Sequence, residues 1–104
     1  MDVISIKDFP GIRIGNAQNI EGGTGCTVIL SESGMCAGLD VRGGGPASRE
    51  SELLKPLANA QTIHAVLLGG GSAFGLDAGG GVMQFLEEKD IGFDVGVTKV
   101  PLVC

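Results

Sequence analysis

The sequence lacks several features that mark common functional classes. It has no tryptophan or tyrosine, four phenylalanines and a single histidine in 104 residues. Seven basic residues are scattered among twelve acidic ones, and the net charge is −5. A nucleic-acid partner needs clustered lysine and arginine to neutralise its phosphates, so we expect none. No apolar run approaches the roughly 18 residues of a membrane span, so we expect no membrane partner either.

The cysteines also exclude some chemistry. Cys26, Cys36 and Cys104 form no CxxC pair and stand beside apolar residues, which indicates buried free thiols in a reducing compartment. The first residues lack the basic segment and apolar core of a signal peptide, so we expect a cytoplasmic protein. The single histidine, His64, opens an apolar segment without nearby cysteine partners. We therefore expect no metal site and no cofactor.

Glycine, in contrast, is abundant. The chain has 19 glycines, against an average usage of about 7%, and they lie inside hydrophobic segments. Apolar residues make up 43% of the chain, which is enough for a core. This composition predicts tight turns and close packing rather than disorder, and the length allows at most one domain.

The stretch from residue 64 to residue 77 organises the chain. Residues 65–68 are uninterrupted apolar, which predicts a strand covered on both faces. Three glycines then relax the backbone for a turn, and Ser72 is placed to cap a helix. The apolar face predicted for this helix comprises Phe74, Ala78, Gly81 or Val82, and Phe85 or Leu86.

Two interpretations of the turn stay open. Helix-start N–H groups carry partial positive charge, so residues 69–72 could hold an anion or an oxyanion. The alternative, which the local sequence favours, is a tight strand-to-helix connection. No Lys-Ser or Lys-Thr pair follows, which excludes a P-loop, and Phe74 stands where a dinucleotide-binding motif needs its third glycine. The Gly-x-Ser-x-Gly elbow is missing around Ser72, so no Ser-His-Asp triad is predicted.

The first 42 residues are predicted to form an antiparallel meander. Alternating apolar residues predict short strands over 3–6 and 12–17, with a turn at Phe9-Pro10-Gly11 between them. A β-branched run predicts a strand over 26–30. A turn at 32–34 is predicted to return the chain as a strand over 35–41, which makes these two strands a hairpin.

The second glycine-rich stretch, residues 42–50, is predicted to be an irregular loop. Its two arginines, Arg42 and Arg49, could bind a carboxylate through both nitrogens. They could equally pair with Asp40 and with Glu50 or Glu52 at the rim, and the sequence does not decide between the two.

Helical segments and the last residues complete the prediction. Leu53, Leu54 and Leu57 indicate a short helical turn over 51–57 with an apolar face, and Gly92 is predicted to end the later helix. Residues 100–104 are apolar, with no turn or polar tail after them. A domain rarely stops within such a strand, so we expect residues 1–104 to be a single incomplete domain.

Several stretches carry a family resemblance. The longest reads Gly70-Gly71-Ser72-Ala73-Phe74-Gly75-Leu76-Asp77-Ala78, and others cover residues 9–15, 25–30, 37–44 and 49–54. In this order they resemble the amino-terminal part of the α subunit in the DmpA-like, or S58, family of self-processing aminopeptidases. That family includes L-aminopeptidase/D-esterase, β-peptidyl aminopeptidase and the nylon-oligomer hydrolase.

The resemblance implies an α+β fold, as part of a four-layer αββα sandwich with antiparallel strands followed by a strand, a glycine turn and a helix. It implies that a precursor cleaves itself into α and β subunits, and that the new amino-terminal Ser or Thr of β is the nucleophile. It also implies that several αβ protomers assemble, and that amino-terminal residues are hydrolysed from short peptides, amides or esters.

The resemblance assigns no catalytic residue to this chain, because the cleavage site lies far beyond residue 104. The substrate-pocket candidates here are Arg42, Gly70, Gly71 and Ser72, which would line a pocket with the remainder of the α subunit and with the β subunit. Two other functions are considered. Ornithine acetyltransferases share a similar architecture and transfer an acyl group to an amine, although the match over residues 70–77 favours the peptidases. The other alternative to the peptidase function is a scaffold domain without catalytic chemistry.

Overall fold

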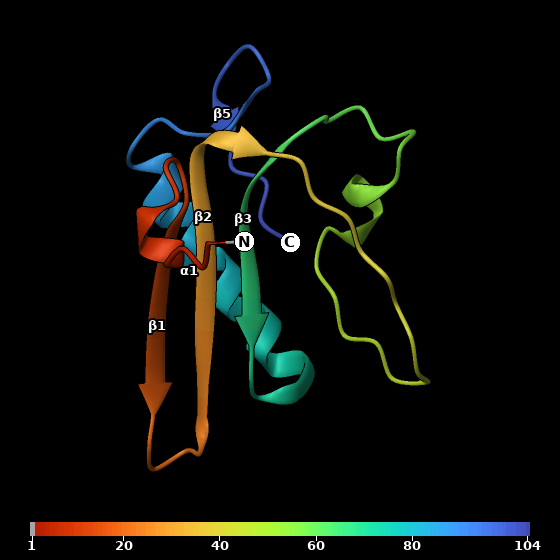
Figure 1. Cartoon of the computed structure of the whole chain (residues 1–104). Coiled ribbons are helices and arrows are strands. Elements are labelled where there is room, and N and C mark those ends of the chain that lie inside the picture. The colour runs from red at the N-terminus through yellow and green to blue at the C-terminus, as the bar shows by residue number, and fades with distance from the viewer. Residues whose placement is uncertain (1) are drawn as a thin grey trace.

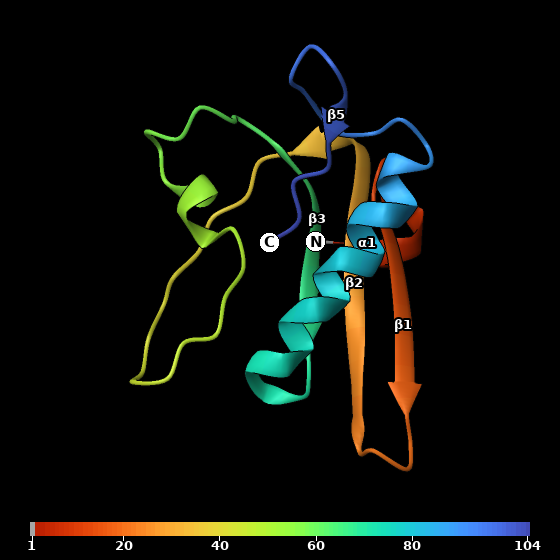
Figure 2. The same ribbon diagram turned by 180° about the vertical axis from the view of Figure 1, so that it is seen from behind.

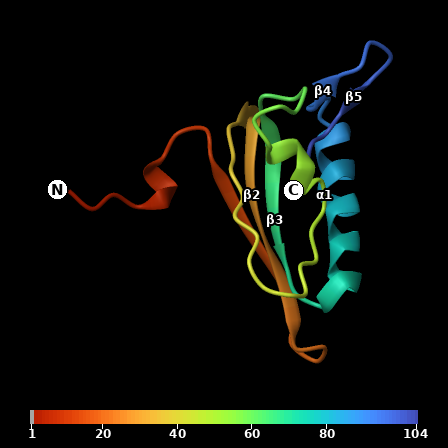
Figure 3. The ribbon, with the colours of Figure 1, turned by 90° about the vertical axis from the view of Figure 1, so that its right-hand side faces the viewer.

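A three-stranded antiparallel sheet forms the centre of the molecule. The computed structural model describes residues 2–104, and its main sheet has the order β1 (Arg13–Asn19), β2 (Thr24–Met35), β3 (Ile63–Gly69). One helix, α1 (Ala78–Glu87), lies along one face of this sheet (Figures 1 and 3). The α+β class predicted from the sequence is confirmed.

The β1–β2 hairpin confirms the first part of the predicted meander, the antiparallel pairing of the strands predicted over 12–17 and 26–30. Asn16 pairs with Thr27 across it, and Asn19 Oδ1 accepts a hydrogen bond from Gly22 N at 2.8 Å in the connecting turn. The predicted turn at 32–34 and the strand over 35–41 are wrong. Gly34 adopts a φ of +85°, but there it only shifts the register of β2 against β3, and residues 36–41 form no strand.

The amino-terminal segment also differs from its prediction. A short 3-10 helix, η1 (Ile6–Asp8), forms where a strand over 3–6 was predicted. Its start is stabilised locally, because the Ser5 hydroxyl accepts a hydrogen bond from Lys7 N at 3.3 Å. The predicted turn follows at Pro10 and Gly11, where Gly11 has a φ of +82°, and β1 then begins as expected.

The predicted strand, glycine turn and helix are present, but the details of the helix are different. A 3-10 helix, η3 (Ser72–Asp77), precedes α1, and Ser72 makes no capping hydrogen bond because it stands inside the turn with a φ of +58°. The prediction of a Ser72-capped helix is therefore wrong. Figure 2 shows α1 passing in front of the strands.

The face that α1 turns toward the sheet is narrower than predicted. Gly79 and Leu86 are buried there, with Val82 and Met83 partly buried beside them. Phe74, which was predicted to belong to this face, is 89% exposed, because η3 carries it away from the sheet before α1 begins.

The core lies between α1 and one sheet face. Its buried members are Leu30 of β2, Ala65 of β3, Leu86 of α1 and Val103. Successive side chains in a strand point to opposite faces, so Val66 and Leu68 point away from α1. Leu68 is 60% exposed, and within residues 2–104 the predicted burial of this strand on both faces is therefore wrong at its end.

A long irregular segment joins β2 to β3. It contains the 3-10 helix η2 (Ser51–Leu54) and lies beside β3 in yellow and green in Figure 1. The helical turn predicted over 51–57 is shorter because Lys55 is extended, as the residue before a proline tends to be. Leu57 is consequently exposed and belongs to no apolar face.

The end of α1 is closed by an aspartate rather than by the predicted glycine. Asp90 takes the left-handed conformation with a φ of +57°, and Ile91 N donates to Leu86 O at 3.0 Å, as in a Schellman motif. Gly92 instead allows the backbone at Val100 to approach closely, because a Cβ on Gly92 would lie 2.6 Å from the Val100 carbonyl carbon. The prediction that Gly92 ends the helix is wrong.

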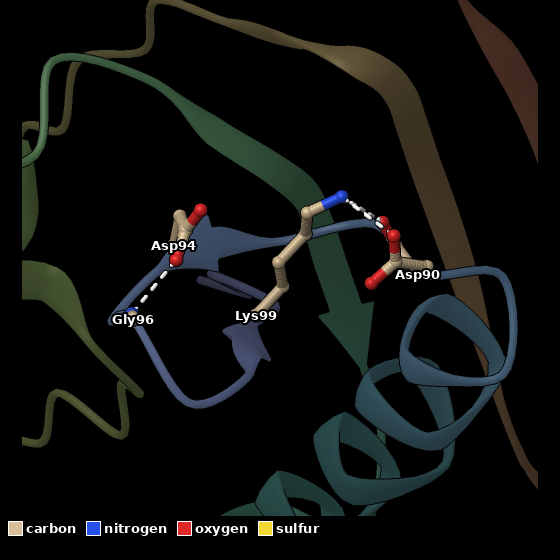
Figure 4. Close-up of polar contacts among 4 residues, drawn as sticks. All are labelled: Asp90, Asp94, Gly96 and Lys99. Atoms are coloured by element: carbon tan, nitrogen blue, oxygen red, sulfur yellow. Dashed lines mark hydrogen bonds and ion pairs between the residues drawn. The ribbon is translucent and has the colours of Figure 1, made fainter.

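A small hairpin follows, formed by β4 (Phe93–Asp94) and β5 (Lys99–Val100). Lys99 Nζ donates to the Asp90 side chain at 2.7 Å and to the Asp90 carbonyl at 3.0 Å, which ties the hairpin to the end of α1 (Figure 4). Within the hairpin, Asp94 Oδ1 accepts a hydrogen bond from Gly96 N at 2.7 Å (Figure 4).

Residues 102–104 return to the main sheet as a parallel neighbour of β3. Val103 bridges Ala65, Cys104 N donates to Ala65 O at 3.1 Å, and Leu67 N donates to Cys104 O at 2.7 Å. Within residues 2–104, no helix is both long enough and apolar enough to cross a membrane.

His64 forms two hydrogen bonds with Leu102 of this parallel segment. Its backbone N donates to Leu102 O at 2.8 Å, and its ring Nδ1 accepts a hydrogen bond from Leu102 N at 3.2 Å. Burial lowers the pKa of His64 below its ordinary value of 6.5. The ring is therefore neutral at pH 7 and acts as a hydrogen-bond acceptor in the folded protein.

We predict that His64→Asn reduces the pH dependence of stability. The unfolded chain takes up a proton on His64 near pH 6.5, whereas the folded chain takes it up only at lower pH, so wild-type stability should fall as the pH falls from about 7 to 5. Asparagine keeps an acceptor but does not titrate, so its urea-unfolding midpoint should vary less over this range. Parallel curves for the two proteins would contradict the assignment.

Candidate functional site

Arg42 lies on the rim of the irregular segment. Its side chain is 85% exposed, and its Nε donates to Asp40 Oδ2 at 2.7 Å. Of the two interpretations left open by the sequence, the structure shows the surface ion pair with Asp40. An exposed pair of this kind contributes little to stability and leaves the other guanidinium nitrogens available. A role of Arg42 in a substrate pocket stays a prediction.

The turn formed by Gly70, Gly71 and Ser72 connects β3 to η3. Gly70 N donates to Gly25 O at 2.9 Å, and Gly71 and Ser72 have φ values of +89° and +58°. The turn folds tightly onto η3, because a Cβ on Gly75 would collide with the Gly70 carbonyl oxygen. The interpretation as a tight connection is thus confirmed.

Ser72 is strained in this position. A left-handed conformation costs a non-glycine residue roughly 1 kcal/mol. Strained residues of this kind are common at functional sites. Anion binding by the turn itself stays a prediction.

A cavity of about 370 Å³ lies between the irregular segment and β3. Its wall is mostly apolar and includes Leu39, Leu54, Leu67 and Leu76. Ser72 lines it. Gly70 and Gly71 line a separate, open groove beside the β1–β2 hairpin, and Arg42 lines neither. The structure therefore does not bring the four candidate residues together in one pocket of this chain.

Arg49 is the arginine that the structure places at the cavity. It is half-buried, and its Nη1 donates to Leu76 O at 3.3 Å while its Nη2 lies 3.0 Å from Met83 Sδ. The alternative in which Arg49 pairs with Glu50 or Glu52 at the rim is wrong, because Glu52 pairs with Lys55 and Arg49 turns toward α1.

Arg49 has room to cross α1 because the helix has a glycine, Gly79, at the crossing point. A Cβ on Gly79 would lie 2.8 Å from Arg49 Cδ, so the glycine lets the arginine stem cross the helix. Leu76 and Met83 lie three residues before and four residues after Gly79, on the same helical face. The sequence carries no signal for this contact, because Gly79 is one of three consecutive glycines and only the structure shows which of them is buried.

The cavity contains one thiol and no catalytic pair. Cys104 Sγ lies 3.6 Å from Glu50 O, and burial, together with the charge of Glu50, raises the pKa of this thiol. It is therefore protonated at pH 7 and a weak nucleophile. His64 lies near the start of β3 and Ser72 follows the glycines after its other end, roughly 17 Å along the strand at 3.3 Å per residue, which excludes a Ser72–His64 pair. Among residues 2–104, no cluster of His, Cys, Asp and Glu is arranged to hold a metal ion.

Comparison with known proteins gives a consistent result. A family model described as "Peptidase family S58" matches residues 5–104. An "Uncharacterized aminopeptidase" of Mycobacterium tuberculosis is 42% identical over 109 residues, covering 95% of this chain and 31% of the relative. A "6-aminohexanoate-oligomer endohydrolase" of Kocuria sp. is 36% identical over 97 residues, covering 92% of this chain and 24% of the relative. The chain thus spans a third or less of the length of these curated relatives.

We predict opposite effects for two neighbouring glycines of α1. Gly80→Ala should stabilise the protein by about 0.5–1 kcal/mol, because its Cβ enters open space and alanine favours a helix. Gly79→Ala should lose this gain, because its Cβ displaces Arg49. Urea unfolding measures both. Adding Arg49→Ala to Gly79→Ala should recover part of the gain, and equal stabilisation by the two single variants would contradict the contact.

Proposed function

The chain belongs to peptidase family S58, and on that premise we propose that it is the amino-terminal part of a self-processing hydrolase. The complete protein would remove amino-terminal residues from short peptides, amides or esters. The observation that carries the proposal is the family match over residues 5–104, together with relatives named as an aminopeptidase and as an oligomer endohydrolase.

The proposal assigns the nucleophile to the remainder of the protein. Two features of this chain support that assignment. The ring of His64 already accepts a hydrogen bond from Leu102 N, and the strained Ser72 follows the other end of β3. A nucleophile at a new amino terminus is chemically sound, because its own amino group or a neighbouring group accepts the hydroxyl proton. The tetrahedral intermediate then requires preorganised N–H donors.

The open face of the sheet supports the proposed four-layer architecture. By the strand register, Ile14, Ile29 and Val66 share the face that points away from α1, one on each strand, and Leu68 stands beside them. Figure 3 shows that α1 covers only the other face. A second sheet, contributed by the rest of the α subunit and by the β subunit, would bury the Ile14 and Ile29 part of this row, as in an αββα sandwich, whereas Val66 and Leu68 line the cavity beside β3.

The proposal keeps Gly70, Gly71, Ser72 and Arg42 as contributors to a substrate pocket completed by the absent part. The Gly70 N–H is already bonded to Gly25 O, but the backbone N–H groups of Gly71 and Ser72 and the free nitrogens of Arg42 suit a developing negative charge or a carboxylate. We further propose assembly of several αβ protomers and a cytosolic location. The latter is supported by the free thiols of Cys26, Cys36 and Cys104.

We predict that the purified protein contains two chains. Intact mass measurement should show two noncovalently bound polypeptides, one beginning with Ser or Thr, because self-cleavage exposes the nucleophile at a new terminus. The same preparation should hydrolyse aminoacyl p-nitroanilides and amides. A single species of 104 residues without hydrolysis would reject the proposal and leave the scaffold interpretation.

We also predict that Arg42→Ala in the complete enzyme lowers kcat/KM by about tenfold, the loss expected when one charge-assisted hydrogen bond is removed. The structure predicts no folding defect, because Arg42 is exposed and, within the described residues 2–104, pairs with Asp40 alone. Steady-state kinetics measure the effect, and Asp40→Asn serves as the control for losing the ion pair alone. Unchanged kinetics would remove Arg42 from the site.

A further inference from the structure

We propose that the cavity beside β3 binds the free carboxylate end of a short peptide through Arg49. The choice of a peptide rests on the proposed function, whereas the carboxylate is inferred from the cavity itself. The distance to Leu76, the passage over Gly79 and the apolar wall together define this site.

The cavity has the size and lining of a small-molecule site. Its volume of about 370 Å³ lies within the range of ligand pockets, which are mostly apolar with a few placed polar groups. Leucines from the irregular segment, β3 and η3 supply the apolar wall, and Ser48 and Ser51 supply hydroxyls at its side. Such a wall suits a peptide end whose last side chain is apolar.

Arg49 is the charged residue among those that line the cavity. The four ion pairs found in residues 2–104 join other residues: Arg13 with Glu32, Arg42 with Asp40, Lys55 with Glu52 and Lys99 with Asp90. Arg49 contacts a carbonyl oxygen and a thioether instead, and both are neutral. Its positive charge is therefore not compensated by a carboxylate in direct contact.

The guanidinium has donors left for a ligand. Of its five N–H groups, the structure engages one from Nη1 and one from Nη2. A guanidinium binds a carboxylate best through two parallel hydrogen bonds, which need a rigid orientation of the fork. The contacts to Leu76 and Met83, made across Gly79, hold it in place before a ligand arrives.

The nearest acidic groups do not occupy this position. The carboxylate of Glu52 pairs with Lys55. Glu50 is close enough to raise the pKa of the Cys104 thiol, but its side chain neither bonds Arg49 nor lines the cavity. The half-buried guanidinium is therefore free to bind a carboxylate of a ligand, and the Cys104 thiol that lines the same cavity is protonated at pH 7 and does not compete with that ligand for it.

Calorimetric titration of the complete protein tests the inference. The probes are N-acetyl-leucine and N-acetyl-leucinamide, which differ only in the charge of the carboxyl end and have no free amino group for an aminopeptidase to attack. Wild type should bind the acid at least about tenfold more tightly than the amide. Arg49→Gln should abolish this preference, and Arg49→Lys, which keeps the charge without the fork, should keep part of it.

Arg13→Gln is the matched control, since Arg13 is an exposed arginine paired with Glu32 outside the cavity, and it should leave both affinities unchanged. Circular dichroism would show that the Arg49 variants are folded. Equal binding of acid and amide by wild type, or an equal loss of both in folded Arg49→Gln, would overturn the inference. Arg49-dependent binding without any hydrolysis of p-nitroanilides would keep it and reject the proposed function instead.

Discussion

The structure depends on the way β3 is held between two unlike neighbours. On one side β2 pairs with it antiparallel, and on the other residues 102–104 pair with it parallel. Ala65, at the centre of β3, is 0% exposed, and the core residues Leu30, Leu86 and Val103 converge on it. The position of α1, the closure of the cavity wall and the burial of His64 all follow from this one strand.

The elements with a local cause were predictable from the sequence. The apolar run before Gly69, the β-branched run of β2 and the turn at Pro10 each carry their own signal, and each is present. The predictions were wrong where a residue type is compatible with two different local structures. The sequence around Gly34 and Gly92 predicts a hairpin turn and a helix end, but their roles depend on contacts with Thr62, 28 residues away, and with Val100, on the far strand of the small hairpin. Ser72 reads as a cap, but the tight packing of the turn fixes its backbone instead.

The surroundings of the two loop arginines could not be predicted from the sequence, for a related reason. Arg42 and Arg49 look alike in the sequence, because both flank the same glycine-rich loop. They differ in their contact with Gly79, which lies thirty residues after Arg49. Because this glycine has no side chain, Arg49 packs against the face of α1, whereas Arg42 does not. The rest of a substrate pocket could not be predicted for another reason, since the two reported relatives are about three to four times as long as this chain.

The parallel pairing of residues 102–104 with β3 also affects the order in which the elements of the sheet can fold. Leu102 is 38 residues after His64, whereas β1 and β2 are joined by a short turn. Closing a long loop costs more entropy than closing a short one, so the β1–β2 hairpin can form early and β3 gains its second neighbour late. On the ribosome, Ala65 and Leu86 would lack Val103 as a packing partner until that residue has left the exit tunnel. The nascent chain would therefore expose its future core for most of the time in which these residues are synthesised.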